Sequence, residues 1–540
     1  MKKSILNDLQ DQKGLQDSLI NDSPSWPASN EFPIIAFNPM PWDYPWGKTD
    51  KEISTVRSLI KSVADCGIDT VKTEGGIVTQ KTFLNAAIDF GISIIPINSD
   101  LGSPKLCLDL FKNLRTHQNL AAWQIMDEPH PYDWGGIFDS NDNIAYPETT
   151  VWNRLTVGYN LINALDPSRI AMFTLAVSTN PVVIGKFGSD NDHVDSIYNQ
   201  YMPYLQHLDT LYHPKVWSFD YYPVACKLKP DVYQKHKHDP GFKPTDSQLD
   251  TYVWYGGLFP YLRCFQDITQ ETGSKYLAYT NCMNYNLYDD PTVSYPGPET
   301  PFRTQYPIPT IGKLRLEIFS AMCFGASGIV YYRYGLGPEL PRFICFESAV
   351  SYKNQTIVKS PTIWPLIKSM NEQVRLWQNM FIGCTVGIHR HSFNGLEAGI
   401  PSAVDVGVEK LTDIDILNTC ITRLVCLSNP ETGNEDKGNA NYGTDTGSYR
   451  TTAYQQPGVL LSWFTNPGYA DGHEHYIAIL NLDIARPQKL LLVLNKGGYY
   501  FLKETKNCDK STYSLCSTVP SPNTAHYITL SPGEMIVLFW

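Results

Sequence analysis

Several features that would place this 540-residue sequence in a functional class are missing from it. It has no apolar stretch long enough to span a bilayer, so we expect no membrane span. It has no Lys/Arg-rich run, and its net charge of −11 argues against nucleic acid as a partner, because nucleic-acid binding needs basic patches that displace counterions. No C-x-x-C or H-E-x-x-H pattern suggests a metal, and we expect no cofactor.

Cysteine is also sparse, with 12 residues in the chain. Cys508 and Cys516 flank a polar loop, and whether they pair depends on a compartment that the sequence leaves open. The N-terminus, MKKSILNDLQDQKG, begins with lysines but has no apolar segment after them. We therefore expect a cytoplasmic protein, or a secreted or periplasmic one whose signal has been removed. Four further cysteines lie in or beside expected elements and are interpreted as small buried hydrophobic residues: Cys66, Cys226, Cys282 and Cys323.

What is present describes a large soluble protein. Hydrophobic residues make up 42% and charged residues 18% of the sequence, and 540 residues are too many for one ordinary core, so two or more domains are expected. Aromatic residues reach 12%, with 33 Tyr and 12 Trp. This abundance fits large cores, and it also fits surfaces on which sugar rings stack; composition does not choose between them.

After a polar N-terminal arm (residues 1–31), residues 32–380 alternate short apolar segments with amphipathic helices. Lys51 to Ala64, for example, carries its apolar residues on one helical face and ends at Gly67, a typical glycine C-cap. Eight such strands predict a closed (β/α)₈ TIM barrel; an open doubly wound sheet is the alternative, disfavoured because no phosphate-binding glycine pattern is present. The strands are expected at 33–38, 68–73, 92–97, 122–126, 170–175, 216–220, 275–280 and 328–332.

Residues 381–540 follow another pattern. Short segments with period-two alternation are separated by turns, which predicts an all-β sandwich as a second domain. The expected strands lie at 385–389, 458–464, 476–482, 489–494, 499–503 and 535–540, and residues 429–449 are expected to form an exposed loop.

The most informative stretch is Ala121 to His130, AAWQIMDEPH, in which a short apolar run ends in two carboxylates and a proline. Proline cannot extend a strand ladder, so Glu128 is predicted at the carboxyl end of the fourth strand, where catalytic residues of such barrels lie. Side chains alternate across a strand. If Trp123 and Ile125 face the helices, then Gln124, Met126 and Glu128 face the lumen and Asp127 points outward.

The same alternation turns Lys72 and Glu74 of the second strand inward, and it puts Ser218 and Asp220 of the sixth strand on one side. Two further carboxylates, Glu74 and Asp220, are therefore predicted at this rim. Glycosidic cleavage uses one carboxylic acid as proton donor and a second carboxylate as nucleophile or base. We therefore expect catalytic roles for Glu128, Asp220 and Glu74, although carboxylates at strand ends also cap helices and form ion pairs, as Glu74 could with Lys72. Residues expected at the same rim to bind or stack on a saccharide, each of which could instead be ordinary packing, are Asn38, Trp42, Trp46, Asn98, Trp134, Tyr222, Tyr279, Asn281, Tyr285 and Arg333.

Three segments carry a family resemblance: WQIMDEP (Trp123–Pro129), SFDYYP (Ser218–Pro223) and RLEIFSAMCFGASGIVYY (Arg315–Tyr332). Together they resemble glycoside hydrolases of the clan A barrel type, most of all the β-galactosidase-like branch, in which β domains follow the barrel. The resemblance implies a glycosidase acting on a β-linked glycan, a galactoside or glucoside, with Glu128 as general acid/base.

The sequence departs from this family at the seventh strand. The family's nucleophile is a glutamate there, whereas residues 276–284 (YLAYTNCMN) contain no carboxylate. Asp220, Glu74 or Glu299 could take its place, the substrate could supply its own nucleophile, or the barrel could bind glycans without cleaving them. An oligo- or polysaccharide is the expected partner in each case, while the sugar, the linkage, the stereochemical outcome and the oligomeric state stay open.

Overall fold

A computed structural model gives the structure of the protein. It describes residues 26–27, 31–37, 47–97, 104–127, 150–176, 193–222, 258–282, 285–286, 305–306, 310–334, 363–391, 409–410, 421–427, 441–442, 458–465, 475–484, 487–494, 500–504, 513–516 and 525–539.

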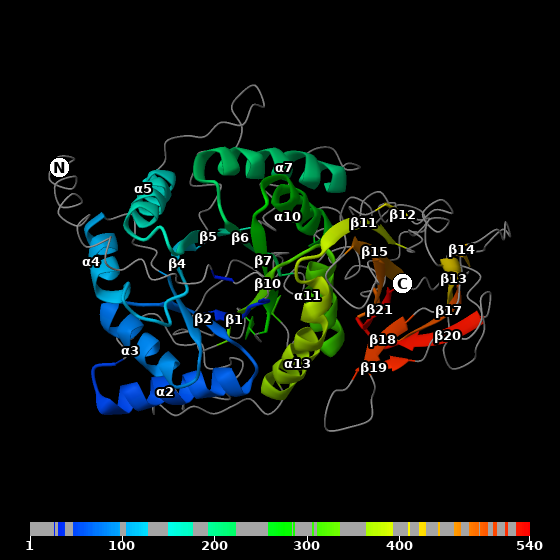
Figure 1. Cartoon of the computed structure of the whole chain (residues 1–540), viewed down its shortest axis with the longest axis horizontal. Coiled ribbons are helices and arrows are strands. Elements are labelled where there is room, and N and C mark those ends of the chain that lie inside the picture. The colour runs from blue at the N-terminus through cyan, green and yellow to red at the C-terminus, as the bar shows by residue number, and fades with distance from the viewer. Residues whose placement is uncertain are drawn as a thin grey trace, which may run out of the picture.

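Eight parallel strands form a closed barrel in the order β1-β10-β7-β6-β5-β4-β3-β2, and the ring closes where β1 pairs with both β2 and β10 (Figure 1). This confirms the predicted (β/α)₈ fold. The barrel strands are β1 (Ile34–Phe37), β2 (Thr70–Glu74), β3 (Ser93–Ile97), β4 (Ala122–Asp127), β5 (Ile170–Ala176), β6 (Val216–Asp220), β7 (Lys275–Asn281) and β10 (Gly328–Tyr332).

Helices surround this ring, and their ends follow local sequence signals. Thr49 and Glu52 form a capping box at the start of the first of them, and Gly273 ends another in the left-handed conformation. Within the described residues, no helix has the length and apolar character needed to cross a membrane. The helices are α2 (Asp50–Asp65), α3 (Ile77–Ile88), α4 (Pro104–Leu114), α5 (Thr150–Leu165), α7 (His193–Tyr212), α10 (Phe259–Thr272), α11 (Ile311–Cys323) and α13 (Ile363–Phe381).

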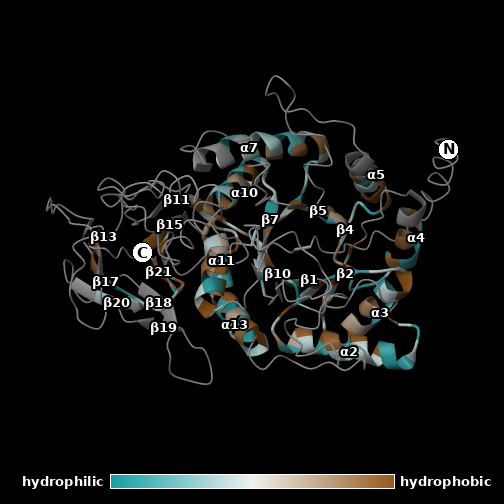
Figure 2. Cartoon of the chain, turned by 180° about the vertical axis from the view of Figure 1, so that it is seen from behind, coloured by the Kyte–Doolittle hydropathy of each residue, from teal (hydrophilic) through white to brown (hydrophobic). Residues whose placement is uncertain are grey.

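Helix α7 is the barrel helix that the sequence did not indicate. Pro203 lies inside this helix, and an internal proline ordinarily predicts the end of a helix because it lacks a backbone N–H donor. Burial of its apolar face stabilises the helix in spite of the proline. Met202, Leu205 and Leu208 are buried, and α7 packs along α10. Figure 2 shows hydrophobic and hydrophilic residues together on such barrel helices, as expected when one face lies on the sheet.

The C-terminal region contains two mainly antiparallel sheets, which confirms the second, all-β part. Residues from both sheets, among them Leu424, Leu490, Leu461 and Ile479, form one core between them. The larger sheet has the order β12-β11-β15-β16-β21-β18-β19, with β12 (Glu409–Lys410), β11 (Thr385–His391), β15 (Val459–Thr465), β16 (His475–Asn481), β21 (Met535–Phe539), β18 (Tyr500–Glu504) and β19 (Tyr513–Cys516). The smaller has β14 (Asn441–Tyr442), β13 (Ile421–Leu427), β17 (Gln488–Leu494) and β20 (Ala525–Leu530), and a two-stranded pair joins β8 (Tyr285–Asn286) to β9 (Gln305–Tyr306).

The outer face of the larger sheet continues the core of the barrel. Phe464, Tyr476 and Val537 belong to the same buried cluster as the barrel helices. At this junction the buried ring of His389 stacks on Phe324, with 3.9 Å between ring centroids. Its two nitrogens lie 2.7 Å from Gln266 Oε1 of α10 and 2.8 Å from Ser462 Oγ of β15. The all-β part is therefore packed on the barrel through a hydrogen-bonded, apolar contact.

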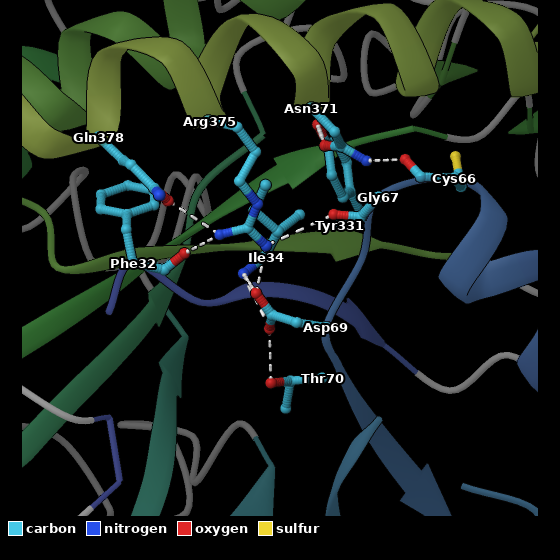
Figure 3. A network of polar contacts seen from close by, with 10 residues as sticks. All are labelled: Phe32, Ile34, Cys66, Gly67, Asp69, Thr70, Tyr331, Asn371, Arg375 and Gln378. Carbon is cyan, nitrogen blue, oxygen red and sulfur yellow. Dashed lines mark hydrogen bonds and ion pairs between the residues drawn. The ribbon is translucent and has the colours of Figure 1, made fainter. Parts of the chain in front are cut away.

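Helix α13 closes the barrel at the amino-terminal ends of the first strands (Figure 3). Arg375 forms an ion pair with Asp69, just before β2, and donates a 2.9 Å hydrogen bond to Phe32 O, just before β1. Asn371 donates to Cys66 O and accepts a 2.7 Å hydrogen bond from the Tyr331 hydroxyl of β10. We call Asp69, Tyr331, Asn371 and Arg375 the amino-end clasp, since they tie the last helix to the first and last strands.

Candidate active site

The structure describes part of the predicted rim. Asp220, Glu74, Tyr222, Tyr279, Asn281 and Arg333 are described with their side chains. The backbone of Tyr285 lies in β8. Other predicted site residues lie outside the described residues, and their roles stay predictions: Glu128, Asn38, Trp42, Trp46, Asn98 and Trp134.

Strand β4 shows where the predicted alternation was wrong. Gln124 pairs with Met172 and Met126 with Phe173, so Ile125 is an extra residue in the ladder, a β-bulge. Trp123 and Ile125 do face the helices as expected, but beyond the bulge Met126 joins the outer core instead of the lumen. Asp127 accepts a 2.9 Å hydrogen bond from Gln124 Nε2, which is turned into the barrel. The carboxylate of Asp127 therefore points inward, not outward.

A network of polar side chains fills the lumen toward the carboxyl ends of the strands. Lys72 Nζ donates to the Tyr279 hydroxyl at 3.0 Å and to Ser218 Oγ at 3.4 Å. Thr174 Oγ1 lies 3.1 Å from the Tyr279 hydroxyl and 3.3 Å from Ser218 Oγ, and it accepts a 3.1 Å bond from Gln124 Nε2. Side chains of β2, β4, β5, β6 and β7 thus meet in one hydrogen-bonded group, which we call the lumen network.

The amine of Lys72 is the charged centre of this network. Lys72 is fully buried, and burial lowers the pKa of its amine to about 7, while the carboxylates of Asp127 and Asp220 oppose that shift. An amine with this pKa is present in both charged and neutral forms near pH 7. The sequence placed Lys72 in the lumen correctly, but its described partners are not the Glu74 carboxylate that was suggested.

Glu74 is instead near another cation. Burial raises the pKa of its carboxyl group, and the nearby guanidinium of Arg333 opposes that shift. Arg333 directly follows β10 and is itself buried. Two charged groups expected at the rim, one expected to act in catalysis and one to bind saccharide, therefore lie within electrostatic reach of each other.

Aromatic rings line the rim above β1, β6 and β10. The Tyr222 hydroxyl lies 3.5 Å from Asp220 Oδ2, and its ring centroid is 5.1 Å from that of Tyr332. The ring centroid of Phe37, at the end of β1, lies 5.3 Å from that of Tyr332 and 5.9 Å from that of Tyr279. Tyr222 therefore connects the carboxylate of Asp220 to a group of aromatic rings at the carboxyl end of the barrel.

A buried carboxyl group on helix α11, outside the barrel, contacts the carboxyl end of β7. Glu317 of α11 accepts a short hydrogen bond from Thr280 Oγ1 and one from the backbone of Asn281. Burial raises the pKa of Glu317 to about 8. Glu317 lies on a helix outside the lumen, so it positions the strand that carries Tyr279 and Asn281 and does not belong to the lumen network.

The lumen changes character along the strands. Met172, Val216 and Leu277 belong to an apolar cluster inside the barrel. Two residues later on the same faces stand Thr174, Ser218 and Tyr279 of the lumen network. The lower layer fills the barrel as an apolar plug, and the polar layer begins where active sites of this fold lie. Alternation along the strands placed Gln124 and Ser218 correctly, and a polar residue at an inward position of an apolar strand is the sequence signal that would also have identified Thr174.

The described rim can bring together carboxylates, an amine and hydroxyl groups for proton transfer. Among the residues that the structure describes, no group of three or more His, Cys, Asp or Glu side chains has the arrangement of a metal site.

Neither a family model nor a curated protein matches the sequence. Solved structures that resemble the chain include a β-galactosidase from the psychrophilic Marinomonas ef1, at 11% identity and a TM-score of 0.36 over 65% of this chain and 62% of that one. A GH30 endoxylanase from Clostridium papyrosolvens C71 matches at 11% identity and a TM-score of 0.36, covering 94% of this chain and 96% of that one. A β-glucosidase from Exiguobacterium marinum matches at 10% identity and a TM-score of 0.35, covering 64% and 98%. At these identities and TM-scores the likeness identifies neither a substrate nor catalytic residues in this chain.

Proposed function

We propose that this protein is a glycoside hydrolase that cleaves a β-linked glycan, a galactoside or glucoside, at the carboxyl end of its barrel. The observation that carries the proposal is the convergence of Asp127 at the end of β4 and Asp220 at the end of β6 on the buried amine of Lys72. Glycosidic cleavage uses two carboxyl groups, and in this fold they stand at the carboxyl ends of barrel strands, as these two do on β4 and β6.

Glu128 directly follows Asp127, and its proposed role is the proton donor. Because the bulge at Ile125 breaks the alternation that had turned Glu128 inward, this role rests on its position at the carboxyl end of β4 and on the family resemblance. It protonates the glycosidic oxygen as the bond from that oxygen to the anomeric carbon breaks. Asp220 is the proposed partner: its carboxylate either attacks the anomeric carbon or takes a proton from the attacking water. Which of the two occurs follows from the separation of the two carboxyl groups, about 5–5.5 Å for retention and roughly 6.5–9.5 Å for inversion.

The proposed saccharide contacts lie beside these acids. The rings of Tyr222 and Tyr332, 5.1 Å apart, offer apolar faces for a sugar ring next to Asp220. Arg333 and Asn281 bring hydrogen-bonding side chains from β10 and β7 to the same rim, for sugar hydroxyl groups. Glu74, balanced by Arg333, is the second choice for the partner carboxylate.

Two substitutions test the roles separately. Glu128→Gln should lower turnover of natural glycosides about 10²–10⁴-fold, because general acid catalysis contributes that much. It should retain most of the activity on 2,4-dinitrophenyl β-glycosides, whose leaving group needs no proton. Asp220→Asn should lower turnover of both substrate types, because it removes the partner carboxylate.

Asp89→Asn is the matched control, since Asp89 is a half-exposed carboxylate on the outer surface, paired with Arg57. Its rates should equal those of the unmodified protein. Unchanged turnover of natural glycosides in Glu128→Gln would contradict the assigned acid. Calorimetric binding of glycans without turnover over a broad panel would replace the proposal with a glycan-binding barrel.

A further inference from the structure

The amine of Lys72 has no structural explanation in the packing of the barrel. The apolar residues Ile95, Met172, Leu277 and Val330, beside and below the lumen network, belong to one hydrophobic cluster inside the barrel. Replacing buried ionic groups by well-packed apolar residues is often neutral or stabilising. A methionine at position 72 would therefore continue the plug, so the cost of burying an amine points to a role toward its neighbours.

The groups that face Lys72 come from three other strands. Its amine donates to Ser218 of β6 and to Tyr279 of β7, and Asp220 stands two residues after Ser218 on the same face of β6. Asp127 of β4 joins the same network through Gln124 Nε2, which donates to Asp127 at 2.9 Å and to Thr174 at 3.1 Å. Both carboxylates act electrostatically on the amine. Two hydroxyl groups hold the amine in place while two carboxylates act on its charge. The attraction is mutual, so an ammonium at this point favours the ionised form of both carboxylates as much as they favour its own.

We propose that Lys72 is the positioning residue of this site, whose ammonium group keeps Asp127 and Asp220 both ionised inside the lumen. This rests on the proposed function, in which Asp220 must be ionised to act as nucleophile or base. Two buried carboxylates that face one site without a cation share a proton, which would remove the partner carboxylate from the reaction.

The first test is the pH profile of kcat/KM for an activated aryl β-glycoside. Lys72→Met should move the acid limb of that profile upward by about one pH unit or more, because the partner carboxylate then takes up a proton more easily. Lys72→Arg, which keeps the charge, should leave the limb in place even if kcat/KM falls. Ser218→Ala, which removes a hydrogen bond to Lys72 but no charge, should also leave it in place. An acid limb that does not move in Lys72→Met would overturn the proposal.

A second readout needs no activity. Urea midpoints are measured at pH 6 and pH 9 for the full-length protein, Lys72→Met, Asp220→Asn and the double variant. At pH 6, below its pKa of about 7, the amine of Lys72 is charged. Asp220→Asn should then lower the urea midpoint by more when Lys72 is present than when Lys72 is replaced by methionine. At pH 9 the amine is neutral, and this difference should shrink. Additive effects at pH 6 would overturn the proposal.

The two readouts separate the proposal from the function beneath it. If no glycoside is cleaved, the proposed function fails, while the urea cycle still decides whether Lys72 and Asp220 act on each other. If Lys72→Met does not fold, Lys72→Arg takes its place. Its coupling to Asp220→Asn should persist at pH 9, where that of lysine fades, because arginine stays charged. Loss of coupling in Lys72→Arg at pH 9 would count against the proposal.

Discussion

At the amino-terminal end of the barrel an aspartate meets a cation between the strands and a helix, whereas at the carboxyl-terminal end aspartates meet a cation inside the lumen. Arg375 reaches Asp69 from α13, and both side chains remain about one third exposed. Lys72 is fully buried and lies among side chains of three other strands. The first arrangement joins a helix to the start of a strand, and its charges lose little hydration because both side chains remain partly exposed. The second costs the desolvation of a fully buried amine, which an apolar residue in contact with the plug would avoid, and this is why we assign it to chemistry.

The largest expected contrast comes from the same substitution at both ends. Asp127→Asn should lower kcat/KM about 10²-fold or more, because it replaces the carboxylate that accepts the hydrogen bond from Gln124 and so disturbs the positions of the lumen network and of the adjoining Glu128. Asp69→Asn should leave kcat/KM within about twofold, since no catalytic role is proposed for it, and lower stability instead. Steady-state kinetics and urea unfolding of both variants measure the contrast. Equal losses of activity at the two ends would remove the distinction between them.

Glu317 sharpens the comparison, because it lies near the carboxyl end but outside the lumen. Its pKa is raised from 4.5 to about 8 by burial, so the folded state holds a proton between these values that the unfolded state has lost. The stability that this group contributes is fully present below pH 4.5 and is lost as the pH rises through 8. Relative to Glu317→Gln, the parent protein should lose on the order of 5 kcal/mol over that window, at about 1.36 kcal/mol for each unit of the pKa difference.

Urea unfolding at half-unit steps from pH 4.5 to 8.5 measures that difference. Lys72 should give the opposite trend against Lys72→Met, since its pKa is lowered from 10.5 to about 7 and the unfolded state binds the extra proton. The relative stability of the parent should therefore rise between pH 7 and pH 10.5. Parallel curves for the parent and Glu317→Gln would mean that Glu317 is ionised in the folded protein.

Arg375→Met should have a smaller effect, a loss of about 1–2 kcal/mol in the free energy of unfolding. It removes an ion pair and the hydrogen bond to Phe32 O, and partial exposure limits the cost because water can reach the remaining carboxylate of Asp69. Arg57→Met, which breaks a more exposed pair with Asp89, is the control and should cost less than about 0.5 kcal/mol. An Arg375→Met variant no less stable than the control would show that the amino-end clasp does not stabilise the barrel.

The comparison also marks how far the sequence reaches. Hydrophobic periodicity and the glycine and proline residues between elements predicted the bounds of each barrel strand to within one or two residues. These signals suffice because the burial of a strand depends on its own residues. Lumen positions on β2 and β6, such as Lys72 and Asp220, followed from simple alternation. On β4 the bulge at Ile125 reversed the phase and brought Asp127 inward, and a bulge depends on how neighbouring strands pair. Helix α7 depends on packing against α10 in the same way.

The smallest expected effect lies within the amino-end clasp, at a single hydroxyl group. Tyr331→Phe removes the 2.7 Å hydrogen bond to Asn371 Oδ1 but keeps the ring in the core and leaves Asn371 bonded to Cys66 O. The loss in free energy of unfolding should be about 1 kcal/mol, the net value of one buried hydrogen bond, and kcat/KM should not change. Tyr276→Phe, which removes a 3.1 Å bond to a backbone carbonyl in α11, gives a buried hydroxyl of the same kind for calibration. If Tyr331→Phe lowers kcat/KM while Tyr276→Phe does not, the two ends of the barrel are coupled through β10, and the separation of structure from chemistry drawn above is wrong.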